Sequence, residues 1–167
     1  MPAMPMIIVR TALCAALVAG ASPILAHEPV TKPAAIATVV SPTARDAAAS
    51  VDAFHAALRR GDTATASKLL ADDVLIFESG GVERSKAEYQ SHHLGADAEF
   101  AKAVPSALTR RAGEASGTMA WIASEGRTSG AYNGKPIDLA TTETMVLRRS
   151  GKGWRIVQIH WSSAKSR

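Results

Sequence analysis

The sequence predicts a single α+β domain, with helices in its first half and a run of antiparallel strands in its second half. In the first half, apolar residues recur at steps of three and four, which is the spacing of one face of a helix. In the second half, β-branched and aromatic stretches alternate with turns that contain glycine. We expect the folded domain over residues 43–163, a common domain size, with no internal repeat.

The first two helices follow from caps and periodicity. Residues 41–43, Ser-Pro-Thr, combine a hydroxyl cap with a proline that suits a first turn. The buried stripe of this first helix is expected to consist of Val51, Phe54, Ala57 and Leu58. Gly61 ends the helix, and Asp62 or Thr63 then caps a second, short helix.

A strand is predicted at Val74–Glu78, followed by a turn at residues 79–81. The third helix is predicted from about Ser85 to Val104, because Pro105 cannot continue it. Gly95 weakens this helix, so a kink or break is expected there. The apolar stripe of the third helix consists of Tyr89, His93, Ala96, Phe100 and Val104.

The remaining strands are predicted at residues 108–115, 118–125, 142–149 and 154–162. Asn133-Gly134 is a strong signal for a tight hairpin turn, because both residues tolerate a positive φ. Residues 150–153, which contain two glycines, are expected to join the last two strands.

The N-terminus is typical of an exported precursor. Residues 1–26 contain one basic residue, Arg10, followed by an apolar run, and they end at Ala26. This order predicts a secretory signal peptide, and therefore a periplasmic or secreted protein. The apolar run is too short to span a bilayer, and we expect no membrane insertion once it is removed. The only cysteine, Cys14, lies in the signal, which excludes disulfides from the mature chain. Residues 27–42 are predicted to be a disordered linker and residues 164–167 a tail.

Charge and motifs argue against nucleic-acid and nucleotide partners. The chain carries 19 basic and 15 acidic residues, and its formal net charge is +4. The basic pairs are scattered instead of gathered on one face: Arg59-Arg60, Arg110-Arg111 and Arg148-Arg149. Phosphate loops, dinucleotide fingerprints and serine elbows are lacking, so we expect no cofactor and no nucleic acid.

The order of elements resembles the SnoaL-like branch of the nuclear-transport-factor-2-like superfamily. The matching blocks are residues 51–55 (VDAFH), 60–62 (RGD), 69–74 (LLADDV), 142–149 (TTETMVLRR) and 153–162 (GWRIVQIHWS). The last block is also similar to the association domain of calcium/calmodulin-dependent kinase II. This resemblance implies a strongly curved, mostly antiparallel sheet with helices packed in its concave face, a cone with a pocket and frequently a homodimer through the sheet. Members of the superfamily include isomerases, dehydratases and hydrolases as well as domains without known activity, so function must be argued from the site.

His93 is the first candidate site residue. It shares the apolar stripe of the third helix with Tyr89, and both are expected to line the pocket. Asp97 lies four residues after His93, within reach of a helical side-chain contact. A carboxylate beside an imidazole raises its basicity, as a general base requires. The alternative is a core histidine bonded to a carbonyl or to Asp97.

Three strand residues complete the predicted pocket. Strand alternation places His160 on the face of Trp154 and Ile156, which lines the pocket if this face looks inward. Glu78 and Glu143 each lie on an otherwise apolar strand face, where a carboxylate is costly unless it is paired or neutral. Each acid either lies at a solvated strand end or pairs with a histidine inside the cavity.

We expect no native metal. His92 and His93 are adjacent on a predicted helix, so their side chains diverge by about 100° and do not easily share one ion.

Three functions remain open. The first is the binding of a small, largely apolar organic molecule. The second is a cofactor-independent isomerase, dehydratase or hydrolase with His93 as general base and Asp97 orienting it. The third is a homodimeric assembly module without catalysis.

Overall fold

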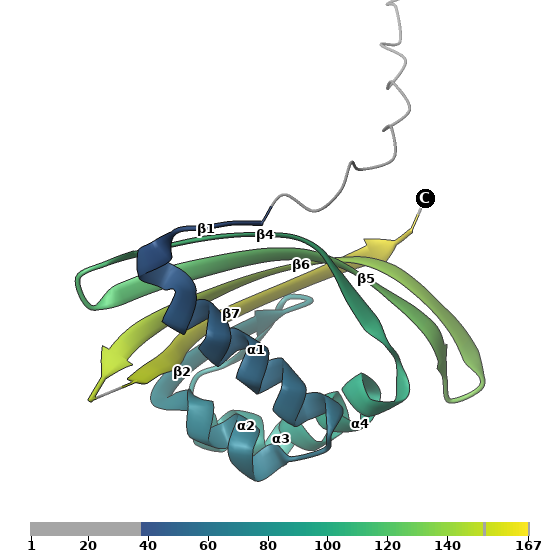
Figure 1. Ribbon diagram of the computed structural model, residues 1–167. Coiled ribbons are helices and arrows are strands. Elements are labelled where there is room, and N and C mark those ends of the chain that lie inside the picture. The colour runs from purple at the N-terminus through teal and green to yellow at the C-terminus, as the bar shows by residue number, and fades with distance from the viewer. Residues whose placement is uncertain (1–37, 152, 167) are drawn as a thin grey trace, which may run out of the picture. The chain divides into compact units, whose positions relative to one another are not determined.

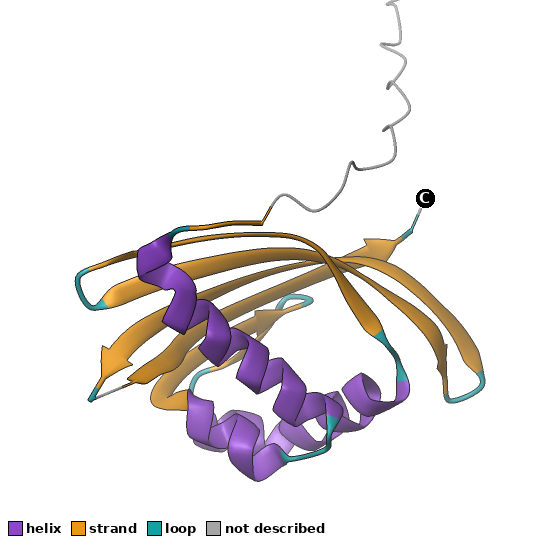
Figure 2. Cartoon of the chain, viewed as in Figure 1, coloured by secondary structure: helices purple, strands orange, loops and turns teal. Residues whose placement is uncertain are grey.

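The computed structural model describes residues 38–151 and 153–166. The predicted signal peptide and residues 27–37 of the predicted linker lie outside the described residues. Four α-helices pack on one face of a curved, seven-stranded sheet (Figure 1), and the strands form the other layer (Figure 2). The α+β architecture predicted from the order of elements is therefore confirmed.

The helices lie in the first two thirds of the chain. They are the 3-10 turn η1 (Pro42–Ala44) and the helices α1 (Arg45–Arg59), α2 (Thr63–Leu69), α3 (Lys86–His92) and α4 (Leu94–Ala103). Asp62 and Ser85 cap α2 and α3 by accepting hydrogen bonds from Thr65 N and Glu88 N at 2.9 and 3.0 Å. Among the described residues, no helix has the length and apolar character needed to cross a membrane.

The strands are β1 (Thr38–Val40), β2 (Leu70–Glu78), β3 (Gly81–Glu83), β4 (Ser106–Ser116), β5 (Met119–Tyr132), β6 (Lys135–Ser150) and β7 (Gly153–Lys165). Their order in the sheet is β1-β4-β5-β6-β7-β2-β3. The β4–β5–β6–β7 meander is antiparallel, whereas β1 on β4 and β2 on β7 are parallel pairs. The sheet is therefore mixed, and the predicted antiparallel run is its central part.

The boundaries differ from the sequence prediction at several places, most of all in β5 and β6, which extend to the Asn133-Gly134 turn, well beyond the predicted residues 118–125 and 142–149. Thr38–Val40 form an edge strand within the segment predicted to be a linker, and β7 extends to Lys165 within the predicted tail. The predicted third helix is two helices, and the break falls at His93, two residues before Gly95. The turn at Asn133-Gly134 is confirmed, with φ of 51° and 75°.

The core lies between the helices and the concave face of the sheet. Its largest fully buried side chains are Val51, Phe54, Leu70, Val74, Tyr89, Val104, Ile122, Met145, Leu147, Ile156 and Ile159. The predicted α1 stripe is buried as expected, because all four of its residues are in this core.

A β-bulge at Val157 changes which side chains of β7 face the core. Val146 pairs with Gln158 while the next residue, Leu147, pairs with Ile156, so Val157 is an extra residue without a partner. Before the bulge Ile156 faces the core, and after it Ile159 does, so the alternation shifts by one residue. All residues of β7 beyond Val157 therefore point to the face opposite to the one that simple alternation predicts.

Two glycine-to-alanine changes should have opposite effects. A Cβ on Gly113 would lie 2.5 Å from Ile122 Cδ1 and 2.9 Å from the Trp121 carbonyl oxygen, so Gly113→Ala should destabilise the domain by about 1–3 kcal/mol. A Cβ on Gly95 in α4 meets nothing within 4 Å, so Gly95→Ala should stabilise it by up to about 1 kcal/mol. Urea unfolding of both variants measures the difference, and equal effects would contradict the close approach at Gly113.

Candidate functional site

A cavity of about 710 Å³ lies between the helices and one end of the curved sheet. Side chains of α1, α4 and strands β2 and β4–β7 line it. The apolar part of its wall includes Leu58, Ala96, Phe100, Ala101, Leu108, Leu139 and Trp161. The charged part consists of Asp52, His55, Arg59, Glu78, Asp97, Arg111, Glu125 and Glu143. This size and mixed lining suit a small organic molecule.

His55 and Glu143 form an acid–base pair in the cavity wall. His55 Nε2 lies 2.8 Å from Glu143 Oε2, and the Trp161 indole N–H donates to the same oxygen at 2.7 Å. The Glu143 side chain is 9 % exposed and that of His55 is 30 % exposed, so the imidazole is the more accessible partner. A buried carboxylate that orients a more accessible imidazole is an arrangement that a general base uses.

The environment of Glu143 favours its ionised form. Burial, the largest single cause, would raise the pKa of the Glu143 carboxyl, but the lowering causes together outweigh it, and the hydrogen bond from His55 and the charge of that imidazole are the largest of these. Trp161 and Arg111 add to this lowering.

The stabilising effect of Glu143 should depend on pH. Because the pKa of Glu143 is lower in the folded state, the unfolded chain binds more protons. The contribution of Glu143 to the unfolding free energy is therefore complete above the ordinary pKa of a glutamate. It is lost as the pH falls through the folded-state pKa. We expect wild type to exceed Glu143→Gln in unfolding free energy by about 1–3 kcal/mol at neutral pH, with the gap narrowing toward about pH 3. Denaturant titrations at several pH values measure the gap, and a constant gap would contradict the prediction.

Arg111 introduces a buried positive charge into the same wall. Its residue is 7 % exposed; Nη1 lies 2.6 Å from Asp52 Oδ1, and Nε donates to Ser124 Oγ at 3.2 Å. The Arg110-Arg111 pair is divided between solvent and the cavity wall, because Arg110 is exposed and Arg111 is buried. Strand alternation separates the two side chains, because Arg111 shares its face with buried Gly113.

Asp97 pairs with Tyr89 and not with His93. The Tyr89 hydroxyl donates to Asp97 Oδ2 at 2.7 Å, and Asp97 lines the cavity while Tyr89 is buried behind it. Burial raises the pKa of the Asp97 carboxyl, and burial followed by the charge of Asp97 raises the pKa of Glu78, which also lines the cavity. Burial and the neighbouring Asp97 likewise raise the pKa of the Tyr89 phenol, so it remains a hydrogen-bond donor.

His93 does not line the cavity. It is the residue between α3 and α4, its side chain is 66 % exposed, and its Nδ1 contacts Glu83 Oε1. This hydrogen bond, followed by the charge of Glu83, raises the pKa of the His93 imidazole. The predicted pairing of Asp97 with the His93 side chain is absent, because the helix break turns the ring toward β3.

His160 also lies outside the cavity. Its ring packs edge-on against Phe77 at 6.4 Å between centroids, and both side chains are exposed on the outer face of the sheet. The bulge at Val157 is the physical reason, since it places Trp161 in the cavity wall where alternation predicts His160. Of the predicted site residues, Glu78, Asp97 and Glu143 line the cavity, and Tyr89 donates a hydrogen bond to Asp97. The two predicted histidines, His93 and His160, do not line the cavity.

The sequence did contain a signal for His55. His55 lies four residues after Val51 and three before Leu58, so it flanks the buried stripe of α1 and remains partly exposed. Its partnership with Glu143 joins distant parts of the chain, and local periodicity carries no information about it.

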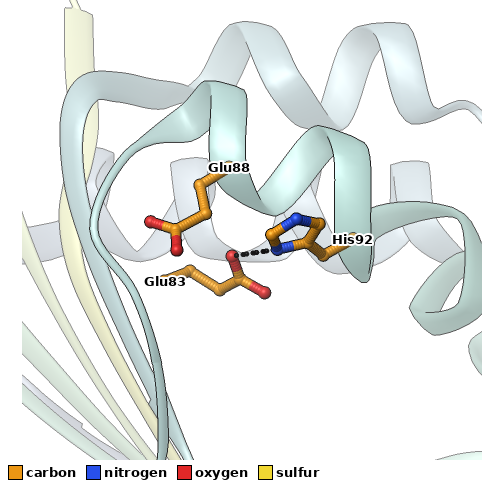
Figure 3. A group of neighbouring side chains, drawn as sticks. All are labelled: Glu83, Glu88 and His92. Carbon is orange, nitrogen blue, oxygen red and sulfur yellow. Dashed lines mark ion pairs between the residues drawn. The ribbon is translucent and has the colours of Figure 1, made fainter.

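A second cluster of ligating side chains lies at the end of β3, outside the cavity. Glu83, Glu88 and His92 each offer one ligand atom, and these atoms lie within 4.8 Å of one another (Figure 3). Glu83 also contacts His93, so one carboxylate faces two adjacent imidazoles. The sequence argument assumed one continuous helix at these two residues, whereas the helix breaks at His93 and each ring contacts a different oxygen of Glu83.

The fold and the cavity define a nuclear-transport-factor-2-like cone. The chain belongs to the SnoaL-like domain family, whose family model matches residues 47–166. No curated protein is significantly similar to the chain.

Solved structures agree with this assignment. A protein from Shewanella frigidimarina NCIMB 400, provisionally assigned as a ketosteroid isomerase, is 36 % identical over 75 % of this chain and 100 % of its own, with a TM-score of 0.69. A provisionally assigned dehydratase from Streptomyces avermitilis is 20 % identical over 74 % and 98 %, with a TM-score of 0.61. A provisionally assigned calcium/calmodulin-dependent protein kinase II association domain from Xanthomonas campestris is 22 % identical over 74 % and 89 %, with a TM-score of 0.63. The last two likenesses concern the fold alone.

Proposed function

We propose that the domain binds a small, largely apolar organic molecule in the 710 Å³ cavity. The observation that supports this most directly is the composition of the cavity wall, which combines apolar side chains with a few ionisable groups, among them the His55–Glu143 pair. Aromatic and aliphatic groups favour an apolar body, while His55 and the wall carboxylates favour a polar group at one end.

A thermal-shift screen of small organic molecules tests the proposal, because a ligand in large excess over its dissociation constant stabilises the folded state measurably. Ala96→Trp, which places an indole in the cavity from α4, should abolish the thermal shift produced by each ligand found in the screen. Ala64→Trp, an exposed position on α2, is the matched control and should preserve it. Equal shifts in wild type and Ala96→Trp would place the ligand elsewhere.

An acid–base enzyme is the second candidate function, and the 2.8 Å contact between His55 and Glu143 favours it. His55 would take a proton from the bound molecule, and the Glu143 carboxylate would stabilise the imidazolium that forms. The provisional isomerase and dehydratase assignments of similar structures are consistent with such chemistry. In this proposal His55 replaces His93 as the base.

Turnover of a ligand found by the screen separates binding from catalysis. His55→Gln should lower kcat/KM by about 10²–10⁴-fold with a much smaller change in ligand affinity. His93→Gln, at an exposed position outside the cavity, is the control and should retain activity. Full activity in His55→Gln would remove His55 from the reaction.

We propose that a second copy of the chain covers the outer face of the sheet. Strands β2 and β5 expose four large apolar side chains on this face, namely Leu75, Phe77, Met119 and Trp121. The strand register places Leu75 and Trp121 in one row across the sheet, with Gln158 and Val146 between them. Trp121→Glu should convert a dimer to a monomer in analytical ultracentrifugation, whereas Ala131→Glu, near the β5–β6 turn, should not. A wild type that is monomeric at high concentration would contradict the homodimer.

Export remains a proposal that rests on residues 1–26. Expression with the native N-terminus in a bacterial host should yield a periplasmic chain that begins at or near His27. An uncleaved chain retained in the cytoplasm would contradict export.

A further inference from the structure

Glu83 presents a buried carboxylate oxygen that lacks a hydrogen-bond partner within the described part of the chain. The residue is 6 % exposed; its Oε1 contacts His93 Nδ1, but its Oε2 accepts no hydrogen bond. A buried carboxylate oxygen without a partner is costly. A ligand that carries positive charge would relieve this cost.

His92 and Glu88 face the unpartnered oxygen from one side of α3. They lie four residues apart, so their side chains project from the same helical face toward the end of β3 (Figure 3). His92 Nδ1 is 3.4 Å from Glu83 Oε2, close enough for an ion pair but without hydrogen-bond geometry. Two ligands of one tetrahedral zinc ion, each about 2.0–2.1 Å from the metal, lie about 3.3–3.4 Å apart, which matches this separation.

The neighbouring groups keep the donors in place. The Arg84 N–H donates to Glu88 Oε2 at 2.6 Å, which orients this carboxylate while the described hydrogen bonds leave Oε1 unused. His93 holds Glu83 through Oε1 in the same manner. The His92 side chain is 57 % exposed, so an ion can enter from solvent.

We propose that Glu83, Glu88 and His92 bind one divalent transition-metal ion of the zinc class. One imidazole nitrogen and two carboxylates form a ligand set that suits zinc and its neighbours better than calcium or magnesium, which prefer oxygen alone. Water would complete the coordination on the exposed side. This site is separate from the cavity, because none of its three residues lines the cavity.

The test uses the untagged full chain, stripped of metal with a chelator and titrated with zinc chloride by isothermal calorimetry. We expect one zinc per chain and a Kd at least about tenfold weaker in His92→Gln and in Glu88→Gln, since even residues behind metal ligands cost about that much when they are lost. Cobalt should give the visible absorption of a tetrahedral site in wild type and lose it in both variants. His160→Gln, which removes an exposed imidazole on the outer face of the sheet, is the matched control and should bind zinc as wild type does.

Absence of zinc binding by wild type would overturn the proposal. Unchanged affinity in both His92→Gln and Glu88→Gln would also overturn it, because any zinc then binds elsewhere on the chain. Both substituted side chains are at least partly exposed, so the variants are expected to fold, and circular dichroism checks this. A failure of the zinc site would leave the cavity proposal unaffected.

Discussion

Replacing Phe54 with alanine should lower the unfolding free energy by about 3–5 kcal/mol. Phe54 is fully buried on α1, and its ring stacks on Trp161 of β7 with 6.5 Å between centroids and 20° between planes. The change removes a ring that joins the helical layer to the sheet and leaves a cavity that the surrounding side chains fill only in part. For a domain with a typical stability of about 5–15 kcal/mol, this is a large fraction of the total.

Phe77→Ala is the matched control for Phe54→Ala. Phe77 is exposed on the outer face of the sheet in the single chain, so the same chemical change should cost about 1 kcal/mol or less when both variants are made in the Trp121→Glu background, where the proposed dimer is dissociated. Urea unfolding followed by tryptophan fluorescence measures both variants. Similar losses at the two positions would contradict the layer packing described here.

Replacing Trp161 with alanine should cost about 2–4 kcal/mol and should also impair ligand binding. Trp161 is partly buried, contacts Phe54 and Tyr89, lines the cavity and donates to Glu143. Its loss removes packing, leaves Glu143 with one hydrogen-bond donor fewer and widens the cavity. Chemical denaturation and the affinity of a screened ligand measure the two effects.

Trp161→Phe separates packing from hydrogen bonding. Phenylalanine retains an aromatic face toward Phe54 but cannot donate to Glu143, so we expect a cost of only about 1 kcal/mol. A double-mutant cycle between Phe54 and Trp161 should give a coupling of about 0.5–1.5 kcal/mol, the usual range for an aromatic pair. Additive effects would indicate that the two rings do not interact.

Local sequence signals were sufficient for most of the fold. The α1 stripe, the Asn133-Gly134 turn and the antiparallel run after the last helix all rest on interactions between residues near in sequence, and the structure confirms them. The parallel pairing of β2 with β7 was not predicted, because it joins residues far apart in the chain and has no local pattern of its own.

The candidate site was predicted less well, for two identifiable reasons. One is irregular backbone: the break between α3 and α4 turns His93 toward Glu83, and strand alternation cannot anticipate the extra residue at Val157. The other is distance along the chain, since His55 of α1 acquires its role only by contact with Glu143 of β6. Acidic residues on apolar strand faces were a better guide, because Glu78 and Glu143 both lie in the cavity wall.

The extra residue at Val157 makes the side chains of the cavity wall depend on the number of residues in β7 as well as on their identity. Deleting one residue from that stretch would restore strict alternation and exchange the two neighbours beyond it, with the imidazole of His160 turned inward and the indole of Trp161 turned to the outside. A length change of this kind would add a second imidazole to the cavity wall of a related protein without any substitution in its sequence.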